Sequence, residues 1–151
     1  MPTAMSAGSV VPPLAFALAA LPLLVDNVRT GRITNANNAI LLVTSLGVLA
    51  LGPSFGMAPF HLPAPSPWLL VLLVPPALFA TGAIGGGAAK FLIALLPWFS
   101  PGEYLAIVAA GFLAAGVIGK LRRQKDVQIA PPTALFGLIV LALSAANVAH
   151  R

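Results

Sequence analysis

Asp26 is the side chain whose type and position most favour chemistry in this sequence. It follows an apolar run and opens the stretch DNVRTGRITN, residues 26–35. A carboxylate at the end of an apolar segment is costly unless it faces water or a partner, so such acids often mark functional sites. The alternative is an interfacial acid neutralised by Arg29, one helical turn further along. The spacing alone favours neither interpretation.

A second unusual stretch, GAIGGGAAKFL at residues 82–92, places three consecutive glycines and one lysine inside apolar sequence. Glycine lets backbone segments approach closely and adopt positive φ. Irregular backbone at membrane depth survives only where it is buried in protein or lines a wet cavity. We therefore expect Gly85, Gly86 and Gly87 to border a cavity on the same side as Asp26. The alternative is a simple tight turn, although such a turn rarely needs three glycines.

The composition indicates the elements that must position these residues. Of 151 residues, 59% are hydrophobic and 7% are charged, whereas soluble domains carry roughly 25% charged residues. We predict an all-α integral membrane protein that forms a single domain over residues 1–151. The chain has no cysteine, two histidines and three acids, so neither disulfides nor a metal or other cofactor site is expected. The net charge of +5 is attributed to membrane topology rather than to nucleic-acid binding.

Six apolar segments can be drawn, at about 9–25, 36–51, 68–84, 88–99, 104–118 and 133–148. Several are shorter than the ~20 residues that a spanning helix needs, so tilt or bilayer thinning must compensate. We expect all six to span the membrane with the N-terminus outside, because Lys and Arg then collect on the cytoplasmic side. The inner residues are Arg29, Arg32, Lys90, Lys120, Arg122, Arg123 and Lys125, and only Arg151 lies outside.

Two further patterns concern the membrane interface and helix packing. Aromatic residues fall at the predicted outer boundaries and suggest an interfacial belt: Trp68, Trp98, Tyr104, Phe55, Phe60 and Phe99. The outer loop 52–67 is Pro-rich, and its His61 is interpreted as a solvated loop residue because no partner lies nearby in sequence. The fifth segment carries a row of small residues that favours close helix packing: Gly111, Ala115 and Gly119.

The two chemical stretches together resemble the type IV prepilin peptidase family, in particular the short CpaA/TadV-like branch of Tad (Flp) pilus systems. That family has an acid-x(6)-Ile-x-Asn motif after a first helix and a Gly-x-Gly-Asp-x-Lys (GxGD) motif after a third. The first motif is matched here by Asp26, Arg32, Ile33 and Asn35, with Thr34 where the family usually has proline. The second is matched by Gly85, Gly87 and Lys90. The resemblance covers nearly the whole chain and implies a GxGD-type aspartic protease core.

Ala88 departs from this pattern, because it stands where the family has its second catalytic aspartate. The family mechanism needs two carboxylates that share a proton, one activating water while the other polarises the scissile carbonyl. Asp26 alone cannot supply both functions, so we expect the chain to be inactive or nearly so. The alanine fits either an engineered substitution or a natural degenerate homologue.

The remaining candidate residues are expected either to support the site or to be solvated. Lys90 either holds the glycine loop or the developing charge, or it is an ordinary positive-inside anchor. Asn35 is expected to cap the second helix rather than to hydrogen-bond near the site. Neither other acid is expected to replace the missing one, because Glu103 lies on the outer side and Asp126 lies in a basic loop.

The resemblance implies a bacterial inner-membrane aspartic endopeptidase that removes the short basic leader of a type IV (Tad/Flp) prepilin at the cytoplasmic face. Its partners would be the prepilin and the lipid bilayer, with no nucleic acid. Methyl transfer is not expected, because the cysteine-bearing insertion of longer family members is missing. A second class stays open, namely a small non-enzymatic membrane protein such as a pseudoenzyme, assembly scaffold or transporter subunit. The missing acid favours it, whereas charges clustered at segment boundaries count against transport.

Overall fold

A computed structural model describes residues 7–51, 65–122 and 128–149 of the chain, and all of its regular elements there are helical. In chain order they are α1 (Ala7–Thr30), α2 (Asn35–Leu51), α3 (Pro65–Ala80), α4 (Gly86–Leu95), the 3₁₀ turn η2 (Leu96–Trp98), α5 (Pro101–Arg122) and α6 (Ala130–Ala149). Each predicted apolar segment therefore corresponds to one helix, and the all-α prediction is confirmed for the described residues. The main differences are at the ends, since α1 and α5 run further than predicted and α3 ends earlier.

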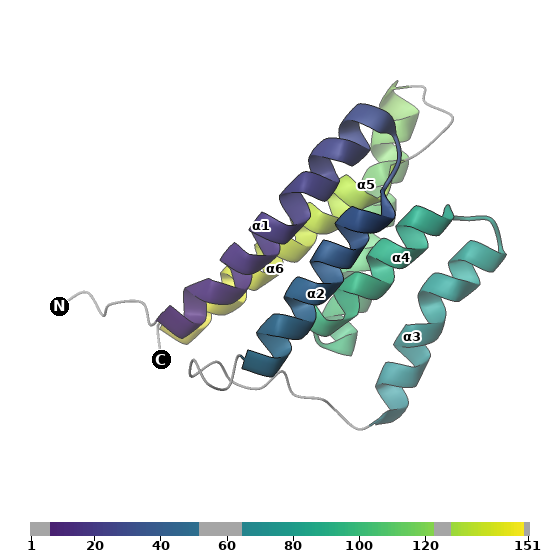
Figure 1. The fold of residues 1–151 in the computed structure, drawn as a ribbon. Coiled ribbons are helices and arrows are strands. Elements are labelled where there is room, and N and C mark those ends of the chain that lie inside the picture. The colour runs from purple at the N-terminus through teal and green to yellow at the C-terminus, as the bar shows by residue number, and fades with distance from the viewer. Residues whose placement is uncertain (1–6, 52–64, 123–127, 150–151) are drawn as a thin grey trace.

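The helices run alternately up and down, so the end of each odd-numbered helix lies beside the start of the next helix (Figure 1). The helix α1 packs on α6 and α2, α5 packs on α6, and α4 lies between α2 and α3. The residues at one end of this bundle, 26–35, 81–90 and 128–130, are called the motif end below. Both chemical stretches of the sequence therefore lie at the same end of the fold.

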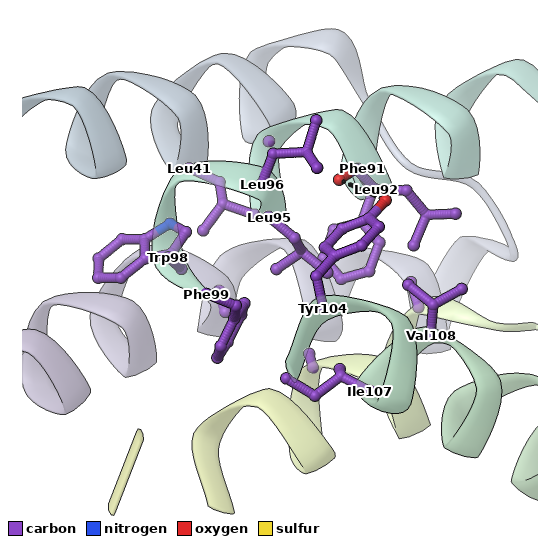
Figure 2. Close-up of a cluster of buried hydrophobic side chains, with 14 of the residues drawn as sticks. Leu41, Phe91, Leu92, Leu95, Leu96, Trp98, Phe99, Tyr104, Ile107 and Val108 are labelled. Carbon is purple, nitrogen blue, oxygen red and sulfur yellow. Dashed lines mark hydrogen bonds between the residues drawn. The ribbon is translucent and has the colours of Figure 1, made fainter. Parts of the chain in front are cut away.

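An aromatic cluster fills the opposite half of the core, where α4 passes through η2 into α5 (Figure 2). Trp98, Phe99 and Tyr104 are each at most 1% exposed. The Phe16 ring meets the Trp98 ring edge-on at a centroid distance of 5.2 Å, and the Tyr104 hydroxyl donates to the Leu92 carbonyl oxygen at 3.2 Å. Edge-to-face pairs of this kind contribute about 0.5–1.5 kcal/mol beyond area burial.

The prediction of an interfacial belt is therefore wrong for Trp98, Phe99 and Tyr104. The physical reason is the turn at η2, which begins directly after α4 and directs these side chains into the bundle. The position of these residues along the sequence predicts their depth in a membrane but not the direction of their side chains. The Trp68 side chain, Phe55, Phe60 and His61 lie outside the residues that the structure describes.

The outer surface of the bundle is also apolar. Large apolar side chains are exposed on every described helix, for example Leu18, Val43, Leu70, Ile93, Leu113 and Leu143. A helix of a soluble protein normally presents polar residues on its outer face. Two helical stretches, Val11–Thr30 and Pro101–Leu121, are long and apolar enough to cross a membrane, and shorter apolar helices accompany them. These features are suited to lipid contact.

The small residues of α5 allow α6 to approach closely, as predicted. A Cβ atom added at Gly111 would lie 2.9 Å from the Thr133 Cβ atom of α6, a distance that real side chains do not tolerate. Ala115 is 2% exposed and Gly119 is buried in the same row. The close contact holds α5 and α6 together beside the motif end.

Candidate functional site

Asp26 lies within α1 rather than after it. The helix continues beyond Asp26 to Thr30, whose hydroxyl donates to the Asp26 carbonyl oxygen at 2.8 Å. Gly31 then adopts a positive φ of 69°, and its N–H donates to the Asn27 carbonyl oxygen at 2.8 Å. Glycine is the usual residue at such a helix end because it has no Cβ penalty there. The half-buried Asp26 side chain is thereby held by regular helix geometry.

The carboxylate of Asp26 is bound by α2. The Asn37 side-chain Nδ2 donates to Asp26 Oδ2 at 3.0 Å. Arg29, the predicted alternative partner, is exposed, and no ion pair joins it to Asp26 in the part of the chain that the structure describes. The interpretation of Asp26 as an acid neutralised by Arg29 is therefore not supported by this geometry.

The start of α2 differs from the expectation in which residue caps it. Thr34 accepts the Asn37 backbone N–H on its Oγ1 at 3.3 Å. A threonine at this position satisfies one of the free N–H groups at a helix start. The predicted cap by Asn35 is therefore wrong, because the Asn35 Oδ1 instead accepts a hydrogen bond from Lys90 Nζ at 2.8 Å. Lys90 thus ties α4 to the first motif.

The glycine segment uses its glycines for two different purposes. The turn after α3 is made at Gly82, whose φ is 73°, while Gly85 is extended and precedes the first residue of α4, Gly86. Gly87 allows the start of α4 to approach Ile33 closely, since a Cβ atom added at Gly87 would lie 3.0 Å from the Ile33 carbonyl oxygen and 3.3 Å from the Ile33 Cβ atom. The triple glycine is therefore more than a tight turn, because one of its members contacts the first motif.

A cavity of about 1240 Å³ opens at the motif end, and Ala88 lies in its wall. Its other lining residues come from all three connections at this end and from α5, including Asn27, Thr30, Arg32, Gly85, Gly87, Phe112, Gly116 and Gln128. Of the three glycines predicted to border a cavity, Gly85 and Gly87 line it and Gly86 does not, while α5 and α6 also contribute to its walls. Asp26 is not among the lining residues, but Asn27, the next residue, is.

The polar groups of the site are mainly amides. Asn38 is 5% exposed, and its Nδ2 donates to the Gly87 carbonyl oxygen at 3.2 Å. The Oδ1 atoms of Asn27 and Asn38 are buried without a hydrogen-bond partner among the described residues, an arrangement that costs about 1–3 kcal/mol for each group. The Trp98 Nε1 atom in the aromatic cluster is likewise without a partner among the described residues, so this property is not confined to the motif end.

The chemistry available to this site is limited by its acids. Asp26 supplies one carboxylate, and Ala88 supplies none. Within the described ranges there is no cluster of His, Cys, Asp and Glu that could hold a metal ion. Glu103 has a structural function at the opposite end of α5, where its Oε2 accepts the Ser100 backbone N–H at 2.9 Å in a capping box. Asp126 lies outside the described residues.

Sequence reasoning missed Asn37 and Asn38, which connect the two motifs. Their signal was present as the polar run NANN, residues 35–38, at the start of an otherwise apolar helix. Comparison of the chain with protein-family models, with curated proteins and with solved structures found no match.

Proposed function

We propose that the chain is a multi-pass protein of a bacterial inner membrane, with six spans and the N-terminus outside. The support is the apolar surface on every described helix together with the alternating helix directions. The motif end is then cytoplasmic, because Arg29, Arg32, Lys90 and Lys120 gather at or near it, in agreement with the positive-inside rule. We expect the membrane to accommodate the short helix α4, because α4 packs between α2 and α3.

We further propose that this protein has the framework of a type IV prepilin peptidase in which the second catalytic acid is missing. One observation carries the proposal: two motifs about fifty residues apart in sequence meet at one cavity. Lys90 binds Asn35, Gly87 packs on Ile33, and Ala88 lines the cavity wall. These contacts support the proposal because they place the glycine stretch beside the stretch that carries Asp26.

In the peptidase family that the chain resembles, the reaction needs two carboxyl groups, and for this reason we do not expect the present chain to perform it. One ionised carboxylate takes a proton from water, while its protonated partner donates a hydrogen bond to the scissile carbonyl oxygen. Asp26 alone can be either ionised or protonated, so it cannot perform both functions at once. Loss of one member of such a unit typically lowers the rate by about 10⁴ or more. The substrate would be a prepilin whose basic leader enters from the cytoplasmic face.

The test is to restore the acid with Ala88→Asp and to co-express the variant with a Flp-type prepilin. Cleavage is detected as a shift on a denaturing gel, and mass spectrometry of the new N-terminus locates the cut. Ala88→Asn is the matched control, because it has nearly the same size and no carboxyl group. We expect cleavage by the Ala88→Asp variant only, and loss of that cleavage when Asp26→Asn is added. A folded Ala88→Asp protein that cuts no prepilin would contradict the peptidase proposal.

A second candidate is a non-catalytic protein that binds prepilin or another membrane partner. Ala88 favours it, because the cavity and the contacts between the motifs are formed without the second acid. The same experiment separates the two candidates. A variant with Asp at position 88 that captures prepilin in a detergent pull-down, yet leaves its leader intact, supports the binding function.

A further inference from the structure

Asn37 and Asn38 are adjacent residues of α2 whose side chains bind two different helices. Asn37 donates to the Asp26 carboxylate of α1 at 3.0 Å. Asn38 donates to the carbonyl oxygen of Gly87, the residue directly before position 88, at 3.2 Å. A single turn of α2 therefore contacts both places where the proposed peptidase would carry its two acids.

The geometry of a helix makes this bridge well defined. Successive residues of an α-helix point about 100° apart, so adjacent side chains reach different neighbours. The turn itself is fixed, because the Asn37 backbone N–H is held by the Thr34 side chain. Asn38 is almost fully buried in an apolar helix, where leucine would pack at less cost unless the amide had a partner to hold.

We propose that Asn37 and Asn38 are positioning residues of the catalytic pair. Asn37 orients the Asp26 carboxylate, and Asn38 holds the first turn of α4, which carries position 88. The inference rests on the proposed peptidase function and assigns to α2 the relative placement of the two acids. Neither asparagine takes part in bond making or breaking.

The first test measures kinetics in the Ala88→Asp background with purified protein and a quenched fluorescent peptide that spans a prepilin leader. Asn37→Ala is expected to lower kcat roughly 10- to 100-fold with little change in KM, as loss of a hydrogen bond to a charged group predicts. Asn37→Asp keeps the shape of the side chain but, when ionised, cannot donate to Asp26, so kcat should fall as far. Asn38→Ala should also lower kcat more than it raises KM.

Ser45→Ala is the matched control on the same helix. It removes the hydrogen bond that the Ser45 hydroxyl donates to the Leu42 carbonyl oxygen, about two turns from Asn37. This variant should retain kcat, because its lost hydrogen bond touches neither acid position. An equal loss of kcat in Ser45→Ala would show that any weakened α2 lowers activity and would overturn the positioning proposal.

The second test needs no activity and uses the chain as it stands. The melting temperature in detergent is compared for Asp26→Ala, Asn37→Ala and the double variant. If Asn37 holds Asp26, the double variant should lose no more than the larger of the two single losses. Fully additive losses would overturn the inference. If Ala88→Asp cuts no substrate, the proposed function fails and the inference fails with it. If Ala88→Asp is active and Asn37→Ala leaves kcat unchanged, only the inference fails.

Discussion

The contact between Gly87 and Ile33 can be tested with two neighbouring substitutions, Gly87→Ala and Gly86→Ala. Both glycines lie in the first turn of α4, and neither has a positive φ, so alanine suits the backbone at both. They differ in what a Cβ atom would meet. At Gly86 the nearest atom is a Phe79 ring carbon at 3.6 Å, an ordinary contact, whereas at Gly87 it is the Ile33 carbonyl oxygen at 3.0 Å.

The expected magnitudes follow from these distances. Alanine is favoured over glycine within a helix by up to about 1 kcal/mol, and both variants share this gain. Gly87→Ala also forces a methyl group against a backbone oxygen that cannot rotate away, and such overpacking costs about 1–3 kcal/mol. We therefore expect Gly86→Ala to stabilise the protein by up to about 1 kcal/mol. Gly87→Ala should be less stable than Gly86→Ala by about 1–3 kcal/mol.

Thermal unfolding of the purified variants in detergent measures this difference. For a chain of this length, 1 kcal/mol corresponds to a shift of about 2–4 °C in Tm, so the two variants should differ measurably. Equal Tm values, or a higher Tm for Gly87→Ala, would show that the glycine segment does not pack on Ile33. One of the contacts that support the proposed function would then be lost, and the hydrogen bonds from Lys90 to Asn35 and from Asn38 to Gly87 would remain to support it.

Three further predictions concern the framework. Gly111→Ala should destabilise the bundle by about 1–3 kcal/mol in thermal unfolding, because the added Cβ atom would collide with Thr133. Gly116→Ala should be neutral or stabilising, because a Cβ atom added there would have no neighbouring atom within 4 Å. Equal effects of the two substitutions would contradict the close contact of α5 and α6. Ser100→Ala should lower the unfolding free energy by about 1 kcal/mol through loss of the α5 cap, and an unchanged Tm would exclude that cap. In this cysteine-free chain, a cysteine at Thr81 should react with an impermeant maleimide only after cells are permeabilised, whereas one at Ser100 should react in intact spheroplasts; the reverse pattern would invert the proposed topology.

The order and approximate extent of the helices could be predicted from the sequence because apolar run length is a strong signal in this chain. The ends were less predictable. The predicted first segment ends at about residue 25, just before the charged Asp26. The structure continues α1 to Thr30, where Gly31 supplies the positive φ that ends it. Local backbone chemistry therefore decided this boundary rather than hydropathy.

The meeting of the two motifs could be predicted only as a shared side of the bundle. The alternation of segments placed Asp26 and the glycine segment at the same end, and the structure has them there. The bridging contacts could not be derived in the same way. Asn37 and Asn38 reach residues 11 and 49 positions away, and one sequence contains no signal for such pairs. Trp98 and Tyr104 show the same limit, because their positions along the chain do not predict that their side chains point into the core.

The alanine at position 88 is physically compatible with the contacts that surround it. Alanine is the best helix former and suits the first turn of α4, and the Asp26 carboxylate already has a partner in Asn37. A second carboxylate near Asp26 would add desolvation and like-charge repulsion to the folded state. The second acid is thus needed for the proposed reaction but not for the contacts between the two stretches, which asparagine, glycine and lysine residues supply. The shape of the proposed site therefore does not depend on the second acid that the proposed reaction would need.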